Sequence, residues 1–160
     1  MVYSQKYCLV QPIAPMQLGD EFDASNWPLH VTIAGVFALA WTDDSHEKFA
    51  DIVTYHKVFN TVTADIAYFG PQKTIKVRRL TMTPELYALH DAVVTFVEEC
   101  GGSFNEPHYL RKDFVPHATM RGTEPPANQT VSFHQLALID MFPDGDHTRR
   151  KIIRLLPLAT

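Results

Sequence analysis

The stretch Phe114-Val115-Pro116-His117-Ala118-Thr119-Met120-Arg121 places a histidine two residues before a threonine, inside a run of apolar and β-branched side chains. The same spacing occurs earlier in the chain, in Pro28-Leu29-His30-Val31-Thr32-Ile33. Runs of this composition predict β-strands, and side chains two residues apart on a strand point to the same face. Each motif therefore directs an imidazole and a hydroxyl to one side of its strand.

Two such motifs facing each other across a cleft could hold a phosphate between an acid and a base. An imidazole titrates near neutral pH, so His30 and His117 could divide the roles of general acid and general base, in an order that the sequence does not fix. Thr32 and Thr119 could donate hydrogen bonds to the non-bridging oxygens. Arg121 is expected on the same face as Thr119 and would add a fixed positive charge for phosphate.

These motifs resemble those of the 2H phosphoesterase superfamily, which is named for two H-x-T/S motifs and includes bacterial RNA ligase-like proteins and cyclic nucleotide phosphodiesterases. In that family a proline often precedes the second histidine and an arginine often follows the threonine by two, as Pro116 and Arg121 do here. Lys6-Tyr7-Cys8-Leu9-Val10 resembles the first strand of the family, whereas Gly35-Val36-Phe37 departs from the usual sequence after the first motif. The resemblance covers most of the chain and implies two lobes related by an approximate two-fold axis.

Other uses of histidine have weaker support in the sequence. A strand histidine is often only a half-buried structural side chain, which would explain either motif taken alone. Zinc sites usually show H-x-H or H-E-x-x-H spacing, and neither occurs, so we expect no metal site and no cofactor. No serine lies in a Gly-x-Ser-x-Gly turn. We interpret the histidines outside the motifs as surface or core residues: His46, His56, His90, His108, His134 and His147.

Side chains near the motifs could bind other parts of a nucleotide. Trp27 and Tyr109 each precede a motif histidine by a few residues and are our candidates for stacking on a base. The basic runs Arg78-Arg79 and Arg149-Arg150-Lys151 are candidate phosphate contacts, although charge on a solvated strand face is the commoner origin of such runs.

Composition bounds the class of protein and its partners. With 160 residues, 46% of them hydrophobic and 20% charged, the chain is typical of a soluble globular protein, and we expect residues 1–160 to form one domain of two lobes, as a monomer. A net charge of −4 disfavours long duplex nucleic acid and favours a small nucleotide, a cyclic oligonucleotide or an RNA end. The longest apolar run, Ile33 to Trp41, is too short to span a membrane, and residues 1–13 do not read as a secretory signal. We therefore expect a cytoplasmic protein with free thiols at Cys8 and Cys100.

The pattern of elements predicts an α+β fold, with antiparallel sheets and helices packed outside them. Helix signals cover residues 45–60, with caps offered by Asp43-Asp44-Ser45, and the stretch from Thr83 to Cys100, ended by Gly101-Gly102. The expected strands are Tyr7–Val10, Leu29–Leu39, a hairpin of Val62–Tyr68 and Lys73–Leu80, Phe114–Met120, Thr130–Ile139 and Arg149–Leu156.

The motifs and the resemblance together predict a metal-independent phosphodiesterase. Its substrate would carry a cyclic phosphate or a 2′-5′ or 3′-5′ linkage, and the sequence does not choose among these. Two alternatives remain open: end-joining of RNA by the same chemistry in reverse, as in a 2′-5′ ligase, and a module that binds a nucleotide without turnover.

Overall fold

The computed structural model describes residues 5–160. The first four residues of the N-terminal stretch, in which we expect no secretory signal, lie outside this range. In chain order the elements are β1 (Tyr7–Pro12), β2 (Glu21–Asp23), β3 (His30–Ala38), α1 (Asp43–Tyr55), β4 (Phe59–Phe69), β5 (Ile75–Leu80), α2 (Pro84–Glu99), β6 (Ser103–Phe104), the 3-10 turns η1 (Pro107–Tyr109) and η2 (Arg111–Asp113), β7 (His117–Thr119), β8 (Thr130–Phe133), β9 (Gln135–Asp140), η3 (Pro143–Gly145) and β10 (Arg149–Pro157). The α+β class expected from the sequence is confirmed.

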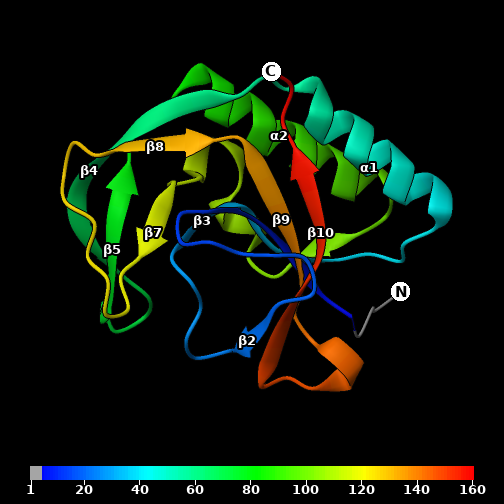
Figure 1. Cartoon of the computed structure of the whole chain (residues 1–160), viewed down its shortest axis with the longest axis horizontal. Helices are drawn as coiled ribbons and strands as arrows, with labels where there is room; N and C mark the ends of the chain where they lie inside the picture. The colour runs from blue at the N-terminus through cyan, green and yellow to red at the C-terminus, as the bar shows by residue number, and fades with distance from the viewer. Residues whose placement is uncertain (1–4) are drawn as a thin grey trace.

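The named strands form one antiparallel sheet in the order β2-β10-β9-β1-β3-β7-β5-β4-β8, and β6 pairs with β3 from outside this path. The two motif strands, β3 and β7, are neighbours near the middle of the sheet (Figure 1). One half of the sheet extends from β3 through β1 to β10, and the other extends from β7 through β5 to β8. The pairing of β3 with β7 therefore joins the two halves.

One strand expected from the sequence is two strands in the structure. Residues 130–139 divide at His134 into β8, which pairs with β4, and β9, which lies between β1 and β10. The His134 amide donates to Oε1 of the buried Gln11 at 2.9 Å, so the break is tied to β1. The sheet is curved, so that β8 at its edge is followed directly in the chain by β9 in its interior (Figure 1). β8 alternates between exposed and buried residues, whereas Leu136 to Ile139 of β9 are all buried, as expected of a strand in the interior of the sheet.

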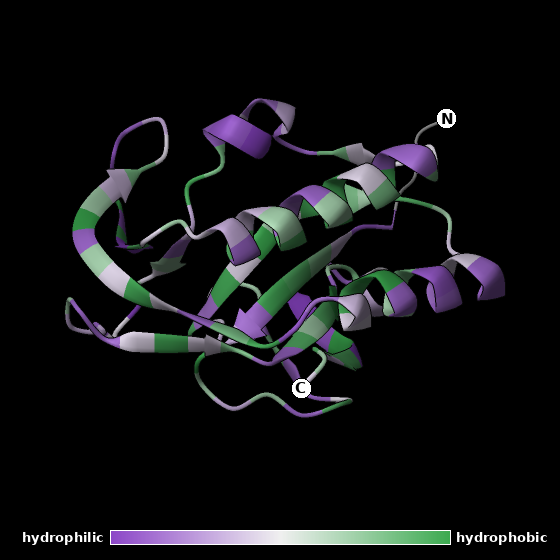
Figure 2. Cartoon of the chain, turned by 90° about the horizontal axis from the view of Figure 1, so that it is seen from above, coloured by the Kyte–Doolittle hydropathy of each residue, from purple (hydrophilic) through white to green (hydrophobic). Residues whose placement is uncertain are grey.

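The helices lie side by side over the sheet (Figure 2). α2 packs on β3 and α1 packs on β10, so the core forms between helices and strands. The expected helix over residues 45–60 begins and ends earlier, because Thr42 rather than Asp43-Asp44-Ser45 provides the cap and the chain leaves the helix at His56. There the Val58 amide donates to the carbonyl of Ala159 at 2.8 Å, and this contact with the C-terminal segment starts β4.

The structure also bears on the two cysteines and on membrane-spanning helices. Cys8 is buried and Cys100 partly buried, and both are free, as expected. Between residues 5 and 160 no helix is long and apolar enough to cross a membrane.

Candidate active site

The central strand pair fixes where the motif side chains point. Val31 pairs with Ala118, and both are 0% exposed. The flanking histidines and threonines are half-buried and lie on the opposite face of the sheet. Antiparallel pairing about Val31 and Ala118 sets His30 across from Thr119, and Thr32 across from His117. Both motifs therefore present their reactive side chains on one face.

Each motif histidine is held by a carbonyl two residues earlier. Nδ1 of His30 lies 2.7 Å from the carbonyl oxygen of Pro28, and Nδ1 of His117 lies 2.7 Å from that of Val115. A carbonyl only accepts hydrogen bonds, so Nδ1 carries the proton and donates it in both rings. In the neutral ring this leaves Nε2 unprotonated and able to accept a proton, and the two sites match in this respect.

Aromatic rings fix both imidazoles further. The Trp27 ring packs on His30 with centroids 4.8 Å apart, and the Phe69 ring meets His117 edge-on at 4.7 Å. Trp27 is itself anchored by a hydrogen bond from Nε1 to the carbonyl of Ala24 at 2.9 Å. Rings held between a carbonyl and an aromatic neighbour have few accessible rotamers, which favours precise proton transfer.

The two histidines do not have the same electrostatic environment. Burial lowers the pKa of His30 to about 4, with further lowering by the positive charges of His117 and Arg121. Burial also lowers the pKa of His117, against the hydrogen bond to Val115. The charge of Arg121 therefore disfavours a proton on His30, whereas the lowering at His117 arises from burial.

A cavity of about 390 Å³ collects the reactive groups. All of the residues to which the sequence assigns proton-transfer or phosphate roles in the motifs line it together: His30, Thr32, His117, Thr119 and Arg121. β7 ends at Thr119, so Arg121 reaches the cavity from the turn that follows and not from the strand. Its Nη1 donates to the carbonyl of Ser25 at 3.3 Å.

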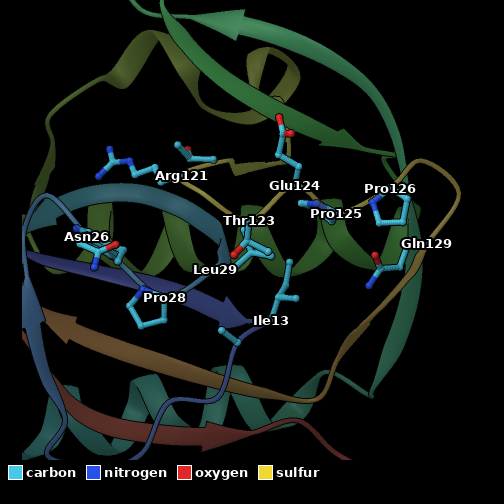
Figure 3. A pocket seen from close by; sticks show the side chains of 13 residues that line it. Ile13, Asn26, Pro28, Leu29, Arg121, Thr123, Glu124, Pro125, Pro126 and Gln129 are labelled. Carbon is cyan, nitrogen blue, oxygen red and sulfur yellow. The ribbon is translucent and has the colours of Figure 1, made fainter.

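A second cavity, of about 670 Å³, adjoins the first and shares Trp27, Pro28, Thr119 and Arg121 with it. In Figure 3 its walls are the segment of Asn26 and Leu29 on one side and the loop that carries Thr123 and Gln129 on the other. This lining combines apolar and proline side chains with two amides, two hydroxyls and the charged Arg121 and Glu124. Such a surface can cover a base and still hydrogen bond to its edge.

The two aromatic candidates differ in position. Trp27 lines both cavities. Tyr109 lies on η1, is 57% exposed, packs against His108 and lines neither cavity. Tyr109 precedes His117 by a few residues in the sequence, but η2 lies between them in the chain.

Two charged residues outside the two motifs also line the cavity of about 390 Å³: Glu106 and Arg150. Glu106 precedes η1 and gives no pattern that could have identified it. Arg150 belongs to one of the two basic runs that are candidate phosphate contacts from the sequence, with a solvated strand face as the alternative. By contrast, Arg78 donates to the carbonyls of Pro125 and Ala64, and it has no place in either cavity lining.

His90 is structural, as the sequence interpretation expected of histidines outside the motifs. It is 0% exposed, with Nδ1 2.7 Å from the carbonyl of Ile33 and Nε2 accepting from the amide of Arg111 at 2.8 Å. Its ring stacks on Phe114, with centroids 3.9 Å apart. His90 thus ties α2 to β3 and to the segment that leads into β7.

Over residues 5–160, no group of three or more His, Cys, Asp or Glu side chains is placed to hold a metal ion.

Comparisons with known proteins identify a matching family and several structures with a similar fold. The model of the 2′-5′ RNA ligase superfamily matches residues 6–143. A phosphoesterase crystal structure is 17% identical, with 98% of this chain and 99% of that chain covered and a TM-score of 0.59. E. coli LigT complexed with 3′-AMP is 16% identical, with coverages of 96% and 98% and a TM-score of 0.58. A protein of Thermus thermophilus, TT0787, is 15% identical, with coverages of 96% and 97% and a TM-score of 0.51. No curated protein matches the chain. At such identities the structures establish a shared fold.

Proposed function

Since the superfamily model matches residues 6–143, the chain belongs to the 2′-5′ RNA ligase superfamily, and on this basis we propose that it is a metal-independent phosphodiesterase. The observation that carries the proposal is the pairing of Val31 with Ala118, which aligns both H-x-T motifs along one face. Because both imidazoles keep Nδ1 on a carbonyl, both Nε2 atoms are available for proton transfer.

The reaction follows from the unequal environments of the histidines. His30 accepts a proton from water at Nε2 as the water oxygen attacks phosphorus. His117, protonated at Nε2, gives its proton to the leaving ribose oxygen as the P–O bond breaks. The positive charge of Arg121 disfavours a proton on His30, which supports this division of roles. The products are a phosphate monoester and a free hydroxyl, and each histidine ends in the protonation state in which the other began.

The phosphoryl charge is stabilised by donors on the same face. Thr32 and Thr119 offer hydroxyl protons to the non-bridging oxygens, and Arg121 offers charged N–H groups. This scheme assigns both proton transfers and charge stabilisation to side chains, so it needs no metal-bound water.

A small nucleotide is the proposed substrate. The catalytic cavity, at about 390 Å³, falls near the lower end of the volumes that bind small molecules. Crystal structures of E. coli LigT, which shares the fold, contain 3′-AMP, ATP or NADP+. A cyclic phosphate or a 2′-5′ or 3′-5′ linkage in such a nucleotide, in a cyclic oligonucleotide or at an RNA end would bring phosphorus between the histidines.

RNA end-joining is the second candidate, since the family model is named for a ligase activity. It runs the same proton transfers in the reverse direction and needs a longer polyanion to be held. The net charge of −4 favours hydrolysis of a small substrate over that alternative.

The test is a substrate panel with chromatographic readout. Cyclic mono-, di- and trinucleotides, nucleoside 2′,3′-cyclic phosphates and 2′-5′ and 3′-5′ dinucleotides are incubated with the protein in excess EDTA. We expect cleavage of at least one class in chelator, and none by His30→Ala. Activity that disappears in EDTA and returns with zinc or manganese would contradict the proposed mechanism. Binding without any turnover would identify a nucleotide-binding module.

A further inference from the structure

Arg150 lies at the start of β10 and lines the catalytic cavity together with both motif histidines. Its position is beyond residues 6–143, so the family match does not assign it a role. The proton-transfer scheme above does not use it either.

The guanidinium of Arg150 is fixed in place from one side. Nη1 donates to the carbonyls of Met141, His147 and Arg149 at 2.7, 3.0 and 3.0 Å. The central carbon lies over the Trp27 ring, 5.7 Å from its centroid. Nε is buried without a partner, and no residue from 5 to 160 accepts a hydrogen bond from Nη2. The side chain is therefore held in one orientation, with its Nε and Nη2 donors available to a ligand.

No carboxylate neutralises Arg150 within ion-pair distance in the described part of the chain, whereas Arg79 and Arg111 both have acidic partners. In the backbone register of β2 and β10, Asp23 lies opposite Arg149 and Phe22 opposite Arg150, so the Asp23 carboxylate acts on Arg150 by its charge without forming an ion pair with it. The thiol of Cys8, which lines the same cavity, is neutral because burial raises its pKa to about 12. Glu106 is the carboxylate of the cavity lining, and it is exposed.

We propose that Arg150 binds a second phosphate of the substrate, one that does not react. Arg121 already supplies positive charge beside His30, so a substrate with a single phosphate would leave one of the two arginines of the cavity without an anionic partner. The preferred ligand is then a nucleotide with phosphates at two positions, or a chain of linked nucleotides, and not a nucleoside 2′,3′-cyclic monophosphate. This inference rests on the proposed function only in that the cavity binds nucleotides.

A pair of ligands that differ by one phosphate tests the proposal without requiring catalysis. Titration calorimetry compares adenosine 3′-monophosphate with adenosine 3′,5′-bisphosphate. A hydrogen-bonded charge is worth about 1.5–3 kcal/mol, so the wild type should bind the bisphosphate roughly 10- to 150-fold more tightly. Arg150→Met should remove most of this preference. Arg149→Met is the matched control, since it removes a cation one residue away that does not line the cavity, and it should keep the preference.

The outcomes separate this inference from the proposed function. Equal affinity of the wild type for both ligands overturns the inference, and so does a preference that persists in a folded Arg150→Met, with folding checked by thermal melting. If Arg150→Met does not fold, Arg150→Lys replaces it: reduced preference supports the inference, and unchanged preference contradicts a role for the guanidinium donors. Cleavage of the substrate panel without a bisphosphate preference contradicts only the inference. A bisphosphate preference without cleavage contradicts only the proposed hydrolysis.

Discussion

At the scale of single residues, the two motifs match in how they hold histidine and differ in what surrounds it. Both imidazoles donate from Nδ1 to the carbonyl two residues before, at Pro28 and Val115. Arg121 has no counterpart after Thr32, because Ala34 is only 2% exposed and belongs to the core. In the proposed mechanism, positive charge therefore reaches the reacting phosphate mainly from the β7 side.

Replacing Arg121 tests this asymmetry. We expect Arg121→Met to lower kcat/KM by roughly 10- to 150-fold, because it removes a charged hydrogen-bond donor worth about 1.5–3 kcal/mol. The charge of Arg121 lowers the pKa of His30, so its loss should also move the acid limb of the kcat/KM profile to higher pH. Arg79→Met is the control, since Arg79 pairs with Asp65 at the surface and lines neither cavity. An unchanged rate and an unchanged acid limb would show that Arg121 does not face the phosphate.

From the sequence, the face on which a side chain lies can be predicted where it depends on local spacing. His30, Thr32, His117 and Thr119 could be predicted because two strand patterns determine which way they point. The basic run of Arg150 could be selected as a candidate phosphate contact, but its approach to this cavity could not be predicted, because it depends on the pairing of β10 with β9 and β2.

At the scale of elements, a bulge in β3 determines which of its residues face the cavity. Between its pairings with Val10 and Cys8, β3 advances from Thr32 to Val36 and so contains extra residues, with Gly35 at φ 81°. A left-handed conformation of this kind suits glycine, and the resulting bulge shifts the alternation of the strand. Ala34 turns into the core as a result, while Gly35 and Val36 line the catalytic cavity. The unusual sequence after the first motif thus has a structural consequence that periodicity could not show.

His90 connects three elements, and its replacement should affect stability more than catalysis. His90→Leu leaves the carbonyl of Ile33 and the amide of Arg111 without their partner in a buried site, where each unsatisfied group costs about 1–3 kcal/mol. We expect a loss of roughly 2–4 kcal/mol in the free energy of unfolding, measured by urea titration. The exposed His108→Leu should change it by no more than about 0.5 kcal/mol. Equal stability of the two variants would rule out His90 as a connector of α2, β3 and the segment before β7.

At the scale of the whole molecule, the site lies where the two halves of one sheet meet. The strands β3 and β7 are far apart in sequence, and the pairing of Val31 with Ala118 is central to the order of strands. Antiparallel sheets and two helices followed from the sequence pattern, whereas the strand order depends on long-range pairing that no local pattern encodes. Burial lowers the pKa of His30 and His117 at the site and of His90 in the core.

The lowered histidine pKa values predict how stability depends on pH. Between the folded pKa of His30, about 4, and its ordinary value of 6.5, the unfolded chain binds a proton that the folded chain does not. Stability should therefore be highest above pH 6.5 and fall as the pH is lowered towards 4, with His117 and His90 acting in the same direction. Thermal melting from about pH 7.5 to about pH 5 measures this, and His30→Asn should flatten the decline. A melting temperature that rises on acidification over this range would contradict the assignment of neutral, buried imidazoles.

The central claim, that the two motifs form one active site, is tested most directly by turnover of the best panel substrate by His30→Ala, His117→Ala and the double variant. Because general acid–base catalysis contributes about 10²- to 10⁴-fold, each single variant should lose a factor in that range while its thermal melt stays close to that of the wild type. The double variant should be little slower than the more damaged single, since residues that act in one step are strongly non-additive. Losses that multiply, or a single variant that turns over at the wild-type rate, would show that His30 and His117 do not act on the same phosphate.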